Sequence, residues 1–185
     1  MRIVHMTCGA LMAGWLMLPA PAHAQQAISL SFGGFAVTGE DARVDGDVLF
    51  ENRDILAFDI NDFNTGSVGL DWLLPVGDFL EVGAGVGFTS RTVPSVYDEF
   101  VNRDGSEIAQ DLKLRIVPMS VTARLLPFGR SRAVQPYIGG GLGILNYRYS
   151  EVGEFVDFTD RSVFSDRFVA SGTALGPVAL AGIRF

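Results

Sequence analysis

The chain has 185 residues, of which 48% are hydrophobic and 19% charged, and its formal net charge at pH 7 is −7. Both histidines and the single cysteine lie within residues 1–24. Residues 25–185 therefore offer no disulfide, no thiol nucleophile, no catalytic histidine and no His/Cys ligand for zinc or haem. The acidic balance, with Lys113 as the only lysine, also argues against nucleic-acid binding, which depends on basic side chains.

The amino-terminal segment has the pattern of a cleaved signal peptide. Arg2 supplies a positive charge, an uncharged apolar run follows at residues 7–18, and Ala22-His23-Ala24 has the small-x-small shape of a cleavage site. The apolar run is shorter than the roughly 20 residues of a membrane-spanning helix. We expect a signal peptide at residues 1–24, export from the cytoplasm of a bacterium, and one mature domain at residues 25–185.

The mature sequence alternates with period two, which predicts an all-β fold. Proline cannot donate to a strand ladder, and the alternation changes phase at Pro118, so we expect a β-bulge or an edge position near this residue. The predicted strands cover residues 27–37, 65–74, 79–92, 111–125, 135–149 and 168–185.

One face of these strands is apolar, and the other is small and charged. This is the pattern of a transmembrane barrel with lipid outside and a polar lumen. A soluble sandwich with its apolar face inside also gives alternation, so alternation alone does not choose. The predicted lipid-facing residues are Leu70, Val82, Val86, Leu112 and Leu114. The predicted lumenal charge network is Asp71, Glu81, Arg91, Lys113, Arg115, Arg124 and Arg184, with Glu81 and Arg124 expected to pair.

The connections between strands alternate between short and long. The short ones contain Pro75 and Pro127, each within a repeated Leu-Leu-Pro-x-Gly motif, and the long ones cover residues 39–64, 93–110 and 150–166. The long connections hold 17 acidic and 4 basic residues. Short periplasmic turns and long external loops are typical of up-and-down membrane barrels.

Other motifs have structural interpretations. Trp72, Phe79, Tyr137 and Phe185 lie near the predicted periplasmic strand ends, where an aromatic girdle would sit. The spacing of Asp41, Asp45 and Asp47 does not fit an EF-hand, so we interpret them as a solvated acidic loop that could share divalent cations with lipopolysaccharide. The glycines near residue 85 lack nucleotide-loop spacing and favour a narrow lumen or a strand bend.

These features together resemble the small outer-membrane β-barrel proteins of the OmpA/OmpW-like group. The best-matching stretches are residues 135–143 (QPYIGGGLG) and residues 181–185 (AGIRF), whose terminal Phe185 looks like the signal read by the barrel-assembly machinery. The resemblance implies a transmembrane, antiparallel up-and-down barrel of about eight strands. Six are identifiable in this chain, which departs from the family pattern in lacking a last hairpin after Phe185; Phe185 is either a true terminus or the result of truncation.

The resemblance also implies a function and partners. Outer-membrane enzymes of this architecture use a histidine, which residues 25–185 lack, so we expect no enzyme, no cofactor and no metal site. The first hypothesis is an integral outer-membrane protein with a structural or surface-interaction role, in contact with membrane lipid, lipopolysaccharide and the barrel-assembly machinery. The alternatives are a narrow pore or transporter for small or hydrophobic solutes, and a soluble periplasmic β-sandwich or lipocalin-like binder.

Overall fold

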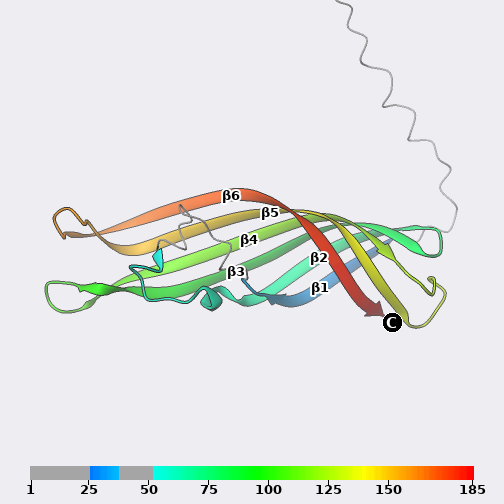
Figure 1. Ribbon diagram of the computed structural model, residues 1–185, viewed down its shortest axis with the longest axis horizontal. Coiled ribbons are helices and arrows are strands. Elements are labelled where there is room, and N and C mark those ends of the chain that lie inside the picture. Colours follow the sequence, from blue (N-terminus) through cyan, green and yellow to red (C-terminus); the bar gives the residue numbers. More distant parts are fainter. Residues whose placement is uncertain (1–25, 38–51) are drawn as a thin grey trace, which may run out of the picture.

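The computed structural model describes residues 26–37 and 52–185, which form one six-stranded antiparallel sheet (Figure 1). Each strand pairs with the next along the chain, and the sheet is open because β1 and β6 each have one neighbour. This confirms an all-β, up-and-down arrangement, but the sheet does not close into a barrel. The predicted signal peptide and acidic loop lie outside the described residues. The strands are β1 (Ala27–Phe35), β2 (Thr65–Val76), β3 (Leu80–Val101), β4 (Glu107–Leu125), β5 (Gln135–Val156) and β6 (Val163–Arg184).

Strands β2 to β6 are longer than the sequence pattern predicted, whereas β1 ends at Phe35, two residues before the predicted end. Residues 102–106 alone connect β3 to β4, and residues 157–162 connect β5 to β6. The predicted long loops at residues 93–110 and 150–166 are therefore wrong, because most of their residues belong to strands. These tight turns lie together at one end of the sheet, and the β2–β3 and β4–β5 turns lie at the other (Figure 1).

The predicted bulge or edge position near Pro118 is also wrong, since β4 lies between β3 and β5 and is not an edge strand. The β3–β4 register holds without a shift from Leu80 opposite Leu125 to Val96 opposite Ala109, and the irregularity lies beyond Val96. Side chains on a regular strand keep alternating between the two faces. The change of phase in the sequence is therefore a change in which face is apolar, with no change in the path of the backbone.

This change divides the sheet into two halves. We call the face that carries Glu81 and Leu112 the inner face, and the face that carries Val82 and Lys113 the outer face. The proximal half is the part of the sheet next to the β2–β3 turn. It includes residues 80–88 of β3, 117–125 of β4, 135–144 of β5 and 175–184 of β6, and the remaining residues of these strands form the distal half. In the proximal half the outer face is apolar and the inner face is mostly small and polar, and in the distal half this order reverses.

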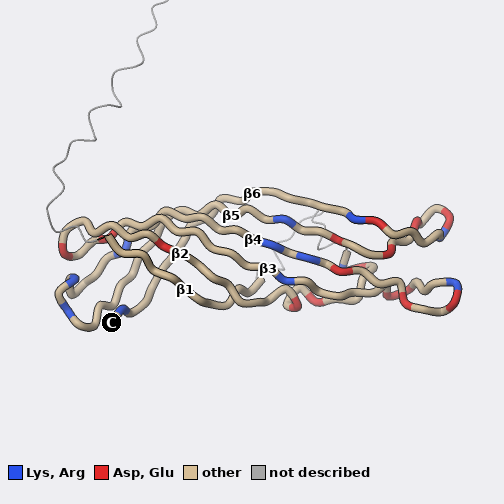
Figure 2. The backbone as a smooth tube through the Cα atoms, turned by 180° about the vertical axis from the view of Figure 1, so that it is seen from behind, with Lys and Arg blue, Asp and Glu red and all other residues tan. Residues whose placement is uncertain are grey.

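The apolar side chains on the outer face of the proximal half form what we call the apolar belt. Most of its large side chains are exposed, among them Val121, Ile138, Leu142 and Leu175. In Figure 2 the strands of the proximal half form a largely uncharged stretch between the turns at that end and the basic segments of β4 and β5. Its members are Ile28, Leu30, Phe32, Val68, Leu70, Trp72, Leu74, Leu80, Val82, Ala84, Val86, Phe88, Val117, Met119, Val121, Ala123, Leu125, Pro136, Ile138, Leu142, Ile144, Leu175, Pro177, Ala179, Ala181 and Ile183.

The distal half has a hydrophobic core on its inner face. Leu112 is completely buried there, and Leu114 is nearly so, which makes the prediction that they face lipid wrong. Residues 52–64, including the 3-10 helix η2 (Ile60–Phe63), cover this core. The covering segment also adds backbone pairing to the free edge of β3, because Ala57 N–H donates to the Val96 carbonyl and Asp98 N–H to that of Ile55. The core comprises Leu56, Phe63, Val93, Tyr97, Ile108, Leu112, Leu114, Ile116, Tyr149 and Val156.

A pair of leucine truncations tests the reversal of the apolar face. Leu112→Ala leaves a cavity in the distal core and should lower the free energy of unfolding by about 2–5 kcal/mol. Leu142→Ala removes the same atoms from the outer face, where Leu142 is 73% exposed and no cavity can form, and should cost less. Urea denaturation of the refolded variants measures both, and a larger loss at Leu142 would contradict the assignment of the faces.

Candidate functional site

The proximal half of the inner face holds a group of charged side chains, which we call the inner charge cluster: Asp71, Glu81, Arg124, Arg130 and Arg184. Glu81 is at its centre, with a side chain that is only 4% exposed. The Arg184 guanidinium donates from Nη1 and Nη2 to the two carboxylate oxygens of Glu81, at 3.3 and 3.1 Å. Arg130 Nε lies 3.5 Å from Glu81 Oε1.

The contact between Glu81 and Arg184 shows that the sheet is curved. Glu81 is on β3 and Arg184 on β6, so β4 and β5 lie between them. Neighbouring strands are about 4.8 Å apart, which would place these strands roughly 14 Å apart in a flat sheet. Their side chains meet because the inner face is concave.

The predicted pair of Glu81 and Arg124 does not form an ion pair. The two residues lie directly opposite each other on β3 and β4. However, Arg124 Nη2 lies 3.6 Å from Asp71 Oδ1 on β2, and the guanidinium carbon lies 5.2 Å from the centre of the Tyr137 ring on β5. The Asp71 carboxylate and the Tyr137 ring hold Arg124 in place, while Arg130 and Arg184 neutralise Glu81.

Glycines on the inner face make room for these contacts. A Cβ atom at Gly85 would come within 2.5 Å of Asp71 Oδ1, so this glycine lets the Asp71 side chain cross β3 toward Arg124. A Cβ atom at Gly182 would come within 2.5 Å of the Tyr137 hydroxyl. Glycine at positions 85 and 182 therefore leaves the space that the Asp71 and Tyr137 side chains occupy.

Sequence reasoning missed two members of this site, Arg130 and Gln135. Gln135 Oε1 accepts from Arg184 Nε at 2.9 Å, and Gln135 Nε2 donates to the carbonyls of Arg130 and Arg132. Gln135 therefore connects β6 to the β4–β5 turn. The signal in the sequence was the Pro-x-Gly turn, because Gly129 adopts a φ of 73° and reverses the chain just before Arg130.

Three residues of the predicted charge network lie elsewhere. Lys113 and Arg115 are exposed on the outer face of the distal half, so their placement in the network is wrong. The change of apolar face at Pro118 explains this, because a prediction that takes the apolar side chains as one continuous face places Lys113 and Arg115 on the wrong side of β4. Arg91 shares the face of Glu81, but it is exposed in the distal half, where its Nε donates to the Asp62 carbonyl at 3.2 Å.

The four aromatic residues predicted to form a girdle do not all lie on the same side of the sheet. Trp72, Phe79 and Phe185 are exposed at the proximal end of the sheet. Tyr137 is on the inner face against Arg124, so its assignment to an outward-facing girdle is wrong. Trp72 Nε1 donates to Gln26 Oε1 at 3.2 Å, which connects β2 to the residue before β1.

A second buried polar group lies in the distal half. Asn52 Nδ2 donates to the Tyr149 hydroxyl at 3.3 Å and also to the Glu151 carboxylate. Burial, and then the nearby Glu151 carboxylate, raise the pKa of Tyr149 above its ordinary value. Gln110 Nε2 donates to the Tyr97 hydroxyl at 3.2 Å and to the Glu154 carbonyl at 2.9 Å. These contacts attach the covering segment and strand ends to the sheet.

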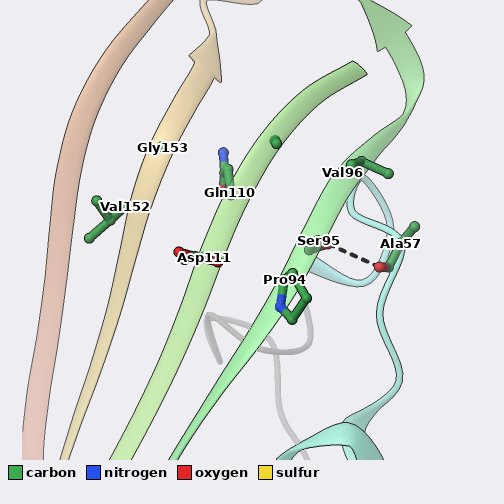
Figure 3. A pocket seen from close by; sticks show the side chains of 9 residues that line it. Ala57, Pro94, Ser95, Val96, Gln110, Asp111, Val152 and Gly153 are labelled. Carbon is green, nitrogen blue, oxygen red and sulfur yellow. Dashed lines mark hydrogen bonds between the residues drawn. The ribbon is translucent and has the colours of Figure 1, made fainter. Parts of the chain in front are cut away.

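Figure 3 shows a hollow of about 510 Å³ beside β3, β4 and β5 in the distal half. Asp111 is the one charged residue that lines it, and Ser95 Oγ, also in its lining, donates to the Ala57 carbonyl at 3.0 Å. The lining pairs no nucleophile with a base and brings no second carboxylate to Asp111. It therefore has no arrangement typical of acid–base or nucleophilic catalysis.

Double-mutant cycles test the partners of Glu81. Glu81→Gln should cost up to about 3 kcal/mol of folding free energy, less than in a fully dry cluster because water reaches Arg184. Coupling with Arg184→Gln should be at least about 1 kcal/mol, and coupling with Arg124→Gln should be clearly smaller. Denaturation of the four variants in each cycle measures both, and stronger coupling to Arg124 would contradict the observed pairing.

The raised pKa of Tyr149 predicts a loss of stability at alkaline pH. The neutral phenol is favoured in the folded state, so its contribution is complete below the unfolded pKa of about 10 and is lost as pH rises beyond it. Tyr149→Phe keeps the ring and cannot ionise. Comparing the free energies of unfolding at pH 8 and pH 11, we expect a smaller alkaline loss in the variant than in the parent protein, and equal losses would contradict this assignment.

Among residues 26–37 and 52–185, no group of three or more His, Cys, Asp or Glu side chains is placed to hold a metal ion. No helix in this part of the chain is both long and apolar enough to cross a membrane. No family model, curated protein or solved structure matches the chain.

Proposed function

We propose that this chain is a non-enzymatic integral protein of the bacterial outer membrane. Its proximal half lies in the bilayer and its distal half projects from it with a structural or surface-interaction role. The main observation in support of this proposal is the apolar belt. Residues 80–88, 117–125 and 175–183 each contribute a segment with apolar side chains outward, matching the roughly 9–11 residues of a membrane-crossing strand.

The dimensions of the belt support this location. From Leu80 to Phe88 the chain advances roughly 26 Å at the usual strand rise, and somewhat less across a bilayer if the strand is tilted. Membrane barrels have an apolar band about 25 Å tall. The belt ends at nearly the same level on neighbouring strands. Phe88 is level with Val117, and the last belt residue of β5, Ile144, lies opposite Met119, one alternation nearer the proximal end.

The soluble alternatives have less support. A soluble sheet buries its apolar face, whereas here the proximal half exposes apolar residues outward and places Glu81 and Arg124 inward. An exposed apolar surface of this extent marks a contact with a partner or a membrane. The distal half follows the soluble order, with Leu112 inside and Lys113 outside. A protein that passes from lipid into water requires this combination.

A structural or surface-interaction role has more support than the alternative of a narrow pore or transporter. The inner face is occupied by the inner charge cluster at one end and by the distal core at the other. Between them lies a hollow of about 310 Å³ whose lining includes Ser31, Thr89, Pro118 and Leu145. Ion conductance in planar bilayers would favour the pore.

Insertion also requires partners for the edges of the sheet. Unpaired strand edges are not tolerated in lipid, so β1 and β6 would pair with further strands. The last hairpin implied by the family resemblance, or a second copy, would provide them. The proposed partners are outer-membrane lipid, lipopolysaccharide and the barrel-assembly machinery.

A matched pair of arginine substitutions on β4 tests bilayer insertion. Val121→Arg places a charge in the belt and should cost about 2–4 kcal/mol of folding free energy in lipid vesicles. Ala109→Arg introduces the same side chain on the same face of the same strand in the distal half, and should cost little. Folding titrations into vesicles measure both variants. Equal costs, or a parent protein recovered outside the vesicles, would contradict the proposal.

A further inference from the structure

The outer face carries two arginines side by side just beyond the apolar belt. Arg115 on β4 lies directly opposite Arg148 on β5, and the next paired positions toward the proximal end are Val117 and Asn146. Lys113 follows on the same face of β4, one alternation farther from the belt. Figure 2 shows the basic segments of β4 and β5 next to the uncharged stretch.

These arginines have no partner within the described residues. The side chains of Arg115 and Arg148 make no hydrogen bond or ion pair there, whereas the arginines of the inner charge cluster lie against carboxylates. Like charges directly opposite each other on neighbouring strands destabilise a sheet. An anion bound between the two guanidinium groups would relieve this repulsion.

The two arginines line a hollow of about 340 Å³ together with Val117, Asn146, Ser171 and Thr173. Thr173 Oγ1 donates to Asn146 Oδ1 at 3.0 Å, which leaves the Asn146 amide group to donate to a ligand. The hollow therefore combines two guanidinium groups with an amide and a serine hydroxyl. A planar guanidinium group can donate two parallel hydrogen bonds to two oxygens of one phosphate. Two such groups beside one hollow therefore favour a phosphate as the ligand.

We propose that the hollow between Arg115 and Arg148 binds the phosphate of an anionic lipid headgroup, with the acyl chains lying along the apolar belt. This rests on the proposed membrane insertion. The belt identifies the source of the phosphate, because Met119, Ile144 and Leu175 continue from the hollow as exposed apolar surface. A free phosphate ion would make no contact with that apolar surface. The net charge of −7 disfavours binding of a nucleic acid, which is itself negatively charged.

The variant Arg115→Gln/Arg148→Gln tests the site. Its control, Arg103→Gln/Arg167→Gln, removes the same charge from distal positions away from the hollow. The protein is held in micelles of an uncharged detergent, and binding of fluorescent phosphatidic acid and phosphatidylcholine is titrated. We expect the parent and control to prefer phosphatidic acid by about tenfold, and the site variant to lose that preference. Parent-like far-ultraviolet circular dichroism establishes that each variant is folded.

Three outcomes separate the possibilities. Unchanged preference for phosphatidic acid in the folded site variant would overturn the site. Displacement of the labelled lipid by inorganic phosphate at the concentration where unlabelled phosphatidic acid displaces it would overturn the lipid source in favour of a free anion. Failure of the proposed function is recognised separately, because the parent protein would then not insert into vesicles. Insertion without a preference for phosphatidic acid overturns this inference alone.

Discussion

The reversal of the apolar face along continuous strands is the constraint on which the rest of the molecule depends. A strand places successive side chains on opposite faces, so an uninterrupted register keeps each residue on a fixed side. On β4 the large apolar side chains, apart from Pro118, are at even-numbered positions from Ile108 to Ile116 and at odd-numbered positions from Val117 to Leu125. The backbone does not shift between them. One sheet therefore has two kinds of outer surface, an apolar one on its proximal half and a polar one on its distal half.

The inner face buries apolar side chains in the distal half and charged side chains in the proximal half. The distal half buries Leu112 and Phe63 under residues 52–64, as a soluble protein does. The proximal half exposes its apolar belt and fills its concave face with ion pairs. Glu81 is nearly fully buried, and its contacts with Arg184 and Arg130 compensate for the loss of water around its charge. Those contacts also tie β3 to β6 and to the β4–β5 turn, which stabilises the curvature of the sheet.

The same division locates the surfaces available to other molecules. The belt offers an apolar surface, and the tight turns at the distal end carry acids such as Asp104 and Asp160, whose pKa values are lowered by hydrogen bonds from Ser106 and Ser162. Arg115 and Arg148 lie at the boundary between these surfaces. In the proposed orientation this boundary is the level of the lipid headgroups, where basic side chains meet phosphates and the apolar belt meets acyl chains.

The sequence by itself determined the all-β class, the neighbour-to-neighbour order of six strands, and the position of Leu70, Val82 and Val86 on one shared face. These follow from local alternation and from turn residues such as Pro75 and Gly77. Only the tertiary structure decided that Leu112 and Leu114 lie inside, that Lys113 and Arg115 lie outside, and that Glu81 pairs with Arg184. The alternation is the same whether water or lipid surrounds a strand, so the sequence pattern could not say which face is inward. The partners of Glu81 depended on curvature and on the β4–β5 turn, which bring together residues that are far apart in the chain.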